Sequence, residues 1–301
     1  MSADVSHNHH YQYAPSLSNK SDVCVLVGHS IEAITSAVVL ASLGQRVHLY
    51  ADLDILSQQL HQYGFEHHLQ ALWQMYEQQQ MIVSQALPSS ADTLIQGYEK
   101  TNCADSDNID NDNPNTQPPT VALYWLFLNS MRTSWTEDHW IIAFNHSNRQ
   151  ALPLIMSGIE QLGDVSALAQ RLQRAWVYYV PFVFLKDGDA YNSMLNPSLW
   201  LLGEKTANSS NHLQVLKPLM QHARATHHAD IATIEFARSS IMAMLATRVS
   251  FMNEMSRLAD SQQVDIKQVS HIMGLDERVG SSYLQAGWGF GGNTLPAELS
   301  R

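Results

Sequence analysis

The chain has 301 residues, too many for one small core, which suggests two domains of roughly 100–200 residues each. Hydrophobic residues make up 45% of it, so a sizeable core can be buried, and the formal net charge is −11 at pH 7. A chain this acidic repels phosphate backbones, which excludes general nucleic-acid binding and leaves anion binding only to a local arginine or a helix N-terminus.

The two cysteines, Cys24 and Cys103, make no disulfide framework and are typical of a reducing cytoplasm. The N-terminal stretch MSADVSHNHHYQY lacks the basic and apolar regions of a signal peptide. No apolar run approaches the roughly 18–20 residues of a membrane helix. We therefore expect a cytoplasmic protein with no membrane and no nucleic-acid partner, in which Cys24 is a buried core residue.

Residues 1–20 are polar and without periodicity, which predicts a loose tail. An apolar run at 22–27 ends at Gly28 and predicts a strand. The apolar residues that follow have helical spacing and stop at Gly44, a typical residue just beyond a helix C-terminus. A second strand is predicted at 47–50, so this region has the size of a βαβ crossover.

Residues 55–85, rich in Gln, Leu and His, predict helix. Residues 99–119 are rich in Asn, Asp and Pro and predict a disordered acidic insertion. Further strands are predicted at 121–128, 140–144 and 176–180. This alternation of strands and helices favours an α/β, Rossmann-like doubly wound parallel sheet over residues 21–205.

Residues 206–301 predict an all-helical domain. Between residues 230 and 259, apolar residues recur every three or four positions, which predicts one long amphipathic helix. A helix of about thirty residues is about 45 Å long and usually crosses a domain or a subunit interface. We expect it to form a two-fold interface between two copies of the chain, giving a homodimer.

Several segments together resemble the UDP-glucose/GDP-mannose dehydrogenase family, in the order in which that family has them. They are FLKDGDAYNSMLNP (184–197), LATRVSFMNEMSRLAD on the long helix, GLDERVG (274–280) and AGWGFGGNTLPAE (286–298). They resemble, in turn, the stretch after the family's NPEF motif, its dimer-forming helix, its GLDxRIG turn and its AGxGFGGSCxPKD active-site loop. The resemblance covers most of residues 22–301 and is most specific in the C-terminal third.

The resemblance implies an NAD-dependent oxidation of the C6 alcohol of a nucleotide sugar to a carboxylate, with two NAD consumed. In the family, a cysteine thiolate captures the aldehyde, a second hydride transfer gives a thioester, and water cleaves it. This route needs a nucleophile that is also a good leaving group, a cation for the alkoxide and a group that moves a proton.

The positions that match the family's catalytic residues are substituted. The cysteine corresponds to Thr294, which cannot form a thioester. The family's lysine and asparagine on the long helix correspond to Arg238, which stays charged, and to Met242, which has no donor. The glutamate of NPEF corresponds to Val183. Of the Lys–Asp pair after the cysteine, only a carboxylate is kept, in Glu298.

The glycine-rich loop after the first strand is the matching cofactor site. Gly28 fits the tight turn of a GxGxxG motif, and Ala33 can replace the third glycine. Ser30 stands where the second glycine lets the pyrophosphate approach, and Glu32 adds a negative charge. Asp52 is the candidate ribose-binding acid. Two alternatives stay open: this loop binds NAD, or it is a Rossmann-like turn without a cofactor.

The family's sugar-binding residues are kept better than its catalytic and cofactor-binding residues. Arg278 precedes Thr294 by the family's interval of sixteen residues, and in the family this arginine reaches across the dimer to the sugar. The alternative is an arginine that only holds its own turn. The glycines that shape the active-site loop, and that count with Arg278 as candidate substrate-binding residues, are Gly287, Gly289, Gly291 and Gly292.

The fifteen histidines do not predict a metal site. Neighbouring residues on a helix point about 100° apart, so the adjacent pairs His67–His68 and His227–His228 do not converge on one ion.

Three hypotheses follow. The first is a degenerate homologue that keeps the fold, loses the oxidation and serves as a dimeric scaffold or as a nucleotide- or sugar-binding protein. The second is an active NAD-dependent oxidoreductase with altered chemistry, in which Glu298 or a water is the base and Arg238 holds the alkoxide. The third is a subunit that pairs with an intact paralogue and lends it Arg278.

Overall fold

The structure, a computed structural model, describes residues 22–62, 66, 68–100, 120–131, 135–148, 150–158, 161–183, 185–186 and 188–287. The expected tail at 1–20 and most of the expected insertion at 99–119 lie outside these residues.

Within the described ranges, eight strands form one sheet in the order β3-β2-β1-β4-β5-β6-β7-β8. The strands are β1 (Val23–Val27), β2 (Arg46–Ala51), β3 (Ile82–Ala86), β4 (Val121–Phe127), β5 (Leu154–Ser157), β6 (Val177–Tyr179), β7 (Trp200–Glu204) and β8 (Thr226–Asp230). All neighbours are parallel except β6 and β7. Strands β3 to β6 have the 3-2-1-4-5-6 order of a Rossmann fold, so the predicted doubly wound class is confirmed.

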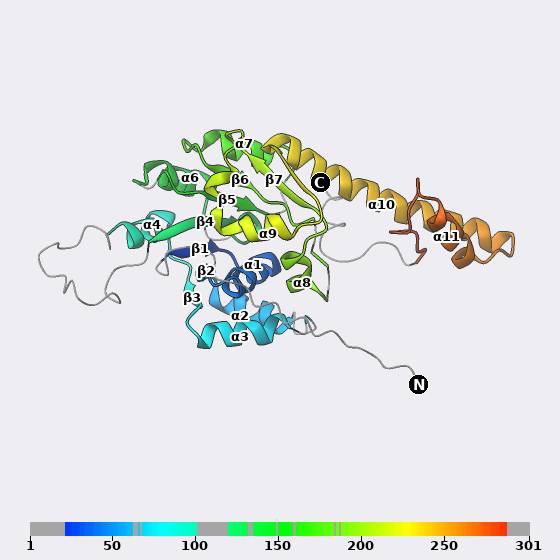
Figure 1. Ribbon diagram of the computed structural model, residues 1–301, viewed down its shortest axis with the longest axis horizontal. Helices are drawn as coiled ribbons and strands as arrows, with labels where there is room; N and C mark the ends of the chain where they lie inside the picture. Colours follow the sequence, from blue (N-terminus) through cyan, green and yellow to red (C-terminus); the bar gives the residue numbers. More distant parts are fainter. Residues whose placement is uncertain are drawn as a thin grey trace, which may run out of the picture.

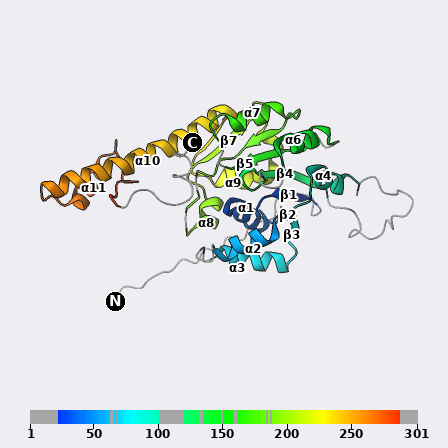
Figure 2. The same ribbon diagram turned by 180° about the vertical axis from the view of Figure 1, so that it is seen from behind.

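Helices cover both faces of the sheet (Figures 1 and 2). One face packs against α1, α3, α8 and α9, and the other against α4, α6, α7 and the first turns of α10. The helices are α1 (Ile31–Ser42), α2 (Leu53–Gln62), α3 (Leu69–Gln78), α4 (Ala91–Lys100), α5 (Leu128–Met131), α6 (Glu137–His146), α7 (Asp164–Arg171), α8 (Ala190–Leu195), α9 (Lys217–His222), α10 (Ile231–Ser261) and α11 (Ile266–Leu275).

The central strands carry the apolar runs seen in the sequence. β1 (VCVLV) is buried at every position, and β4 (VALYWLF) at all but one. A strand covered by helices on both faces needs such a continuous run, because every side chain enters one core or the other. These two buried strands therefore fix the position of the segments that follow their carboxyl ends, after Val27 and Phe127.

Residues 140–144, predicted as a strand, are wrong in type and belong to α6. Trp140, Ile141 and Phe144 are buried, and their spacing of one and then three residues places them on one helix face. Glu137 and Asp138 begin the helix, where acidic side chains are favoured. The strand of this region is β5 instead, ten residues later.

Residues 55–85, predicted as one helix, contain α2, α3 and then the strand β3. Among the described strands, β3 is at the end of the order and pairs only with β2. Such an edge strand needs no continuous apolar run, and Ser84 and Gln85 are only half-buried in it. The polar composition therefore concealed a strand.

The sheet also continues past residue 205, where the first domain was expected to end. β8 pairs in parallel with β7 over Thr226–Asp230 and is the last strand of the sheet. Helix α10 begins at the next residue, with Asp230 as its N-cap. The α/β layer therefore extends to residue 230, and the long helix starts directly from its edge.

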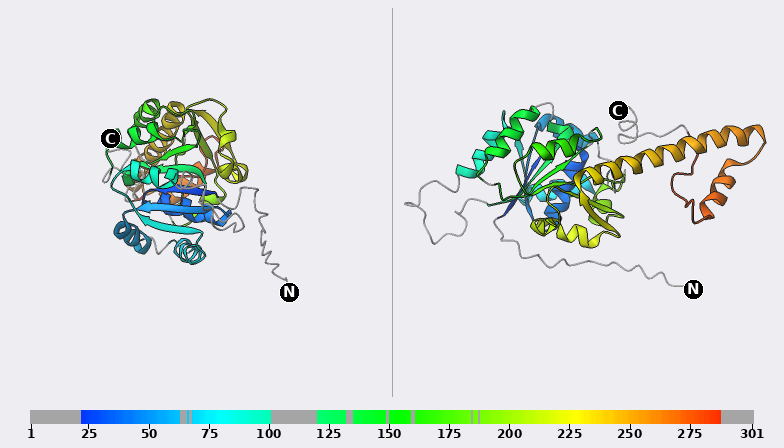
Figure 3. Two further views of the ribbon diagram at one scale, coloured as in Figure 1. Left: turned by 90° about the vertical axis from the view of Figure 1, so that its left-hand side faces the viewer. Right: turned by 90° about the horizontal axis from the view of Figure 1, so that it is seen from above.

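The long helix predicted at 230–259 is confirmed as α10, which has 31 residues. It projects away from the α/β layer, and α11 folds back along its far half (Figures 1 and 3). Its first turns are buried through Ile231 and Ile234, whereas Met244 and Phe251 further along are exposed. Only the start of α10 therefore belongs to the core of the α/β layer.

Candidate functional site

The turn after β1 is held in place by its neighbours. Gly28 has a φ of +148°, and its N–H donates to the Tyr50 carbonyl oxygen at 2.9 Å. A Cβ at this position would lie 2.7 Å from the Cβ of Phe127. Both the backbone angle and the space therefore require glycine. The predicted tight turn at Gly28 is present, and packing against β4 is a sufficient reason for it.

The N-terminus of α1, which a Rossmann fold directs at a pyrophosphate, carries its own cap. Ser30 is the N-cap residue, and its Oγ accepts from the Ala33 N–H at 3.4 Å. Ala33 is fully buried under the sheet, as expected for a residue that replaces the third glycine. Glu32 lies in the first turn, where its negative charge interacts favourably with the helix dipole but would repel a phosphate.

Asp52, directly after β2, caps the next helix. Its Oδ1 accepts from the N–H groups of Asp54 and Ile55, each at 3.1 Å. Burial lowers the pKa of His29, and the charge of Asp52 opposes this shift. The predicted ribose-binding acid therefore interacts with His29 of the glycine turn, and one of its two oxygens, Oδ1, already accepts two hydrogen bonds from α2.

These residues fit a dinucleotide poorly. One α1 donor is taken by Ser30, Glu32 would repel a pyrophosphate, and Asp52 is committed to α2. A Rossmann pyrophosphate normally relies on a second glycine and on open amide donors at this helix end. The turn keeps the shape of a cofactor loop without its full set of binding groups.

A second part of the candidate site lies at the start of α10, where Arg238 is buried with only 6% of its surface exposed. One turn earlier, Glu235 is 4% exposed, and its carboxylate accepts from three backbone N–H groups at the N-terminus of α7. Glu235 is not among the residues predicted from the sequence. The available signal was a charged residue on the apolar face of an amphipathic helix.

A similar buried carboxylate fixes the segment that resembles the stretch after NPEF. Glu66 is 4% exposed, and it accepts from the N–H groups of Gly188 and Ala190 at 2.6 and 2.9 Å. This anchors the start of α8 against the α2–α3 connection. Val183, at the position of the family's glutamate, is half-buried against both cores. Glu66 was likewise missed, because its partners lie more than 120 residues away.

The predicted sugar-binding residues lie along the far half of α10. Arg248 donates to the Gly280 carbonyl oxygen, and the Gly287 N–H donates to Asn253 Oδ1, both at 2.9 Å. Arg278 forms a two-pronged ion pair with Asp276 in its own turn. An open cavity of about 920 Å³ lies between α11 and the segment that ends at Gly287.

Within one chain, the predicted cofactor-binding residues at the glycine turn and the predicted sugar-binding residues near α11 are not brought together. Asn253 is 22 residues beyond Ile231, which is about 33 Å along a helix, so Gly287 lies far from the glycine turn. Figure 3 shows the same separation between α11 and the sheet. The remaining predicted site residues lie outside the described part of the chain: Gly289, Gly291, Gly292, Thr294 and Glu298.

In the part of the chain that the structure describes, no group of three His, Cys, Asp or Glu side chains lies close enough to hold a metal ion. None of the described helices carries the apolar run that a membrane span requires.

The strand order, the glycine turn and the two helical layers define a Rossmann-like α/β protein that is extended by one long helix. The sequence profile of the "UDP-glucose/GDP-mannose dehydrogenase family, central domain" matches residues 232–301. This match covers the C-terminal part of the chain, from the long helix onward, which there resembles the nucleotide-sugar dehydrogenases.

Individual relatives agree. The chain is 33% identical to a UDP-glucose 6-dehydrogenase of Rickettsia bellii over 117 residues, which is 38% of this chain and 27% of the relative. A putative UDP-glucose 6-dehydrogenase of Bacillus subtilis is 34% identical over 122 residues, 38% of this chain and 27% of the relative. The matched stretches thus span little more than a quarter of these relatives.

Solved structures share the fold. A UDP-glucose dehydrogenase from Pyrobaculum islandicum superposes with a TM-score of 0.66 at 19% identity, covering 95% of this chain and 64% of that one. A GDP-mannose dehydrogenase from Pseudomonas aeruginosa gives 0.60 at 15% identity, covering 92% and 62%. The present chain therefore spans less than two thirds of the length of either structure.

Proposed function

We propose that the chain is a catalytically degenerate nucleotide-sugar dehydrogenase homologue that keeps the fold and acts as a dimeric scaffold or as a nucleotide- or sugar-binding protein. The observation that carries the proposal is Thr294 at the position of the family's cysteine. A threonine hydroxyl is barely ionised at neutral pH, and an oxygen ester is not the thioester that the four-electron oxidation passes through.

The rest of the candidate site supports this reading. Arg238 replaces the family's lysine, and a guanidinium group can stabilise an anion but is not a proton acceptor. Met242, one turn later, has no polar hydrogen for a substrate. At the glycine turn, Ser30 and Glu32 stand where a dinucleotide needs open donors. NAD is the family's cofactor, and we expect this chain to bind it weakly or not at all.

Dimerisation is supported by the exposed surface of α10. Four large apolar side chains recur along it at intervals of eight, seven and seven residues, and between 48% and 62% of the surface of each is exposed. They are Phe236, Met244, Phe251 and Leu258. A seven-residue repeat keeps side chains on one helix face, so the same stripe on a second copy can cover it. In such a dimer, a partner's Arg278 could approach the other subunit.

The dimer is tested by sedimentation of the full chain. We expect a dimer for the wild type and a monomer for Phe251→Glu, because a charge in the seam would be desolvated. Asp260→Lys reverses a charge on the same helix at a position outside the stripe, and it should sediment as the wild type does. A Phe251→Glu variant that stays dimeric would refute an α10 interface.

The loss of catalysis is tested by turnover with NAD and a panel of UDP- and GDP-sugars. We expect no sustained NADH production and, by calorimetry at millimolar NAD, no binding. Replacing both Ser30 and Glu32, as Ser30→Gly with Glu32→Gln, should produce measurable NAD binding by opening the α1 N-terminus. Continued NADH formation by the wild type, with a sugar acid as product, would overturn the proposal.

A further inference from the structure

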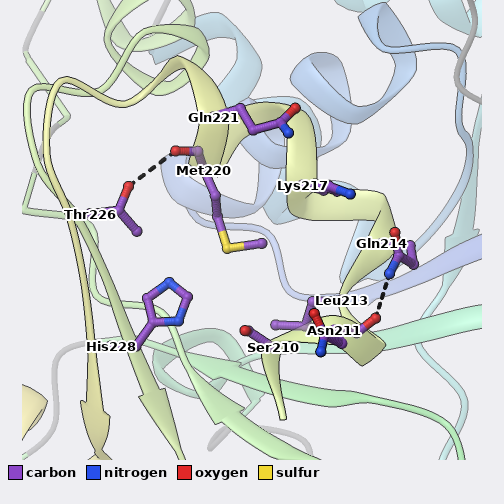
Figure 4. Close-up of a pocket in the computed structure, with 9 residues that line it drawn as sticks. All are labelled: Ser210, Asn211, Leu213, Gln214, Lys217, Met220, Gln221, Thr226 and His228. Atoms are coloured by element: carbon purple, nitrogen blue, oxygen red, sulfur yellow. Dashed lines mark hydrogen bonds between the residues drawn. The ribbon is translucent and has the colours of Figure 1, made fainter. Parts of the chain in front are cut away.

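A small cavity lies on the outer side of the α/β layer, beside the strand β8. Two short 3-10 helices, η1 (Ser210–His212) and η2 (Gln214–Leu216), run into α9 and form one wall, and β8 forms the other (Figure 4). Its volume is about 240 Å³. β8 is five strand spacings from β1, about 24 Å, so this cavity is separate from the glycine turn.

The charge of the cavity is opposite to that of the chain. Of the lining residues that the structure describes, Lys217 and His228 are the two that can carry charge, and none is a carboxylate. Moreover, residues 205–229 contain no Asp or Glu, although the whole chain has 28 and a net charge of −11. Local basic charge within an acidic surface attracts anions to that one place.

Neither basic side chain is used by the fold. Among the described residues, the side chains of Lys217 and His228 have no hydrogen-bond or ion-pair partner. Figure 4 shows them on opposite walls of the cavity. An ammonium group and an imidazole that face one space from two elements can both donate to the same oxyanion.

The remaining lining suits hydroxyl groups and the face of a ring. Asn211, Gln214 and Gln221 supply side-chain amides, each with both a donor and an acceptor. The amide nitrogen of Gln214 donates to the Asn211 carbonyl oxygen, which leaves its amide oxygen for a ligand. The Met220 side chain extends into the space in Figure 4 and offers an apolar surface to C–H groups.

The size of the cavity limits the ligand. At about 240 Å³ the cavity is smaller than the roughly 300–1,000 Å³ of pockets for drug-sized ligands, which favours a ligand of the size of one monosaccharide. We propose that the cavity binds a small hydroxylated oxyanion, a sugar acid or a sugar phosphate, with Lys217 and His228 on the anionic group and the amides on the hydroxyl groups.

The test is isothermal titration calorimetry of the full chain at low salt with four probes: glucuronate, glucose 6-phosphate, inorganic phosphate and glucose. We expect at least one of the two charged sugars to bind, and glucose to bind far more weakly. The tighter of the two charged sugars identifies the oxyanion. Losing one charge-assisted hydrogen bond should weaken binding about tenfold in Lys217→Gln and in His228→Gln.

Lys267→Gln is the matched control. Lys267 is an exposed lysine that lines the cavity beside α11 and has no part in the cavity beside β8. Its replacement should leave the affinity unchanged. Since Lys217 and His228 are exposed, their variants should fold normally, which circular dichroism verifies. The proposal is refuted by equal affinity for glucose and the charged sugars, by unchanged affinity in both variants, or by loss of binding in Lys267→Gln alone.

Discussion

Glu235 connects the long helix to the α/β layer through three hydrogen bonds. Its side chain lies on the buried face of α10 and replaces a conventional cap on α7, whose own N-cap residue, Gly163, has no side chain. Its Oε1 accepts from Gly163 and Val165 at 2.9 and 3.1 Å, and its Oε2 accepts from Ser166 at 3.2 Å. Removing this carboxylate should therefore affect both helices.

The magnitude follows from these three bonds. A hydrogen bond to a charged group is worth roughly 1.5–3 kcal/mol, but the buried carboxylate also pays a desolvation cost, so the three do not add fully. We expect Glu235→Ala to lower the free energy of unfolding by about 3 kcal/mol. Glu235→Gln keeps one acceptor oxygen and turns an NH2 group toward the Ser166 N–H, so about half of that loss is expected.

The measurement is urea unfolding followed by circular dichroism. Glu254→Ala is the control, because Glu254 is an exposed residue on the same helix with an ion pair to Arg257 at 2.8 Å. That variant should lose less than about 0.5 kcal/mol. The reasoning fails if Glu235→Ala is within about 1 kcal/mol of the wild type, or if Glu235→Gln is the less stable of the two.

Three other predictions concern the core around the glycine turn. Gly28→Ala should cost more than Gly44→Ala in thermal unfolding, because both have positive φ but only the first would place its Cβ 2.7 Å from another side chain; equal losses would exclude the steric cause. Burial raises the pKa of Cys24 to about 12, so in a Cys103→Ser background its thiol should react with iodoacetamide at neutral pH only after unfolding; rapid labelling of the native chain would contradict this. Burial lowers the pKa of His48 from 6.5, so its stabilising contribution is complete above pH 6.5 and is lost as the pH falls from 6.5 toward the folded-state pKa. His48→Gln should therefore lose less stability than the wild type between about pH 7.5 and about pH 5.5, measured by urea unfolding.

The sequence predicted the fold wherever burial is uniform. β1, β4 and α10 were found because their apolar residues follow the period of their structure. The errors fall where burial is not uniform. β3 is polar because it is an edge strand, and α6 resembles a strand because residues 140–144 (WIIAF) are all apolar. Local composition cannot separate these cases without the neighbouring elements.

The candidate site was predictable only in part. The glycine turn and the long helix could be located from motif spacing. The roles of Glu66 and Glu235 could not, since each binds backbone N–H groups about 70 to 120 residues away in sequence. The distance between Arg278 and Gly28 was equally hidden, because a motif gives the order of residues along the chain and not the length of the helix between them.

The junction between β8 and α10 has a mechanical consequence. The strand ends at Asp230 and the helix begins at Ile231 with no intervening residue, and the Ile231 Cα lies 3.0 Å from the position that a Cβ on Gly203 would take. Helix α10 is thus about 46 Å long and is held at its first residue by close packing against Gly203. A tilt of about 5° at this residue displaces its far end by about 4 Å. Gly203 therefore determines the direction of α10 and, through it, the position of α11. A larger residue at position 203 would shift α11 although it does not contact α11.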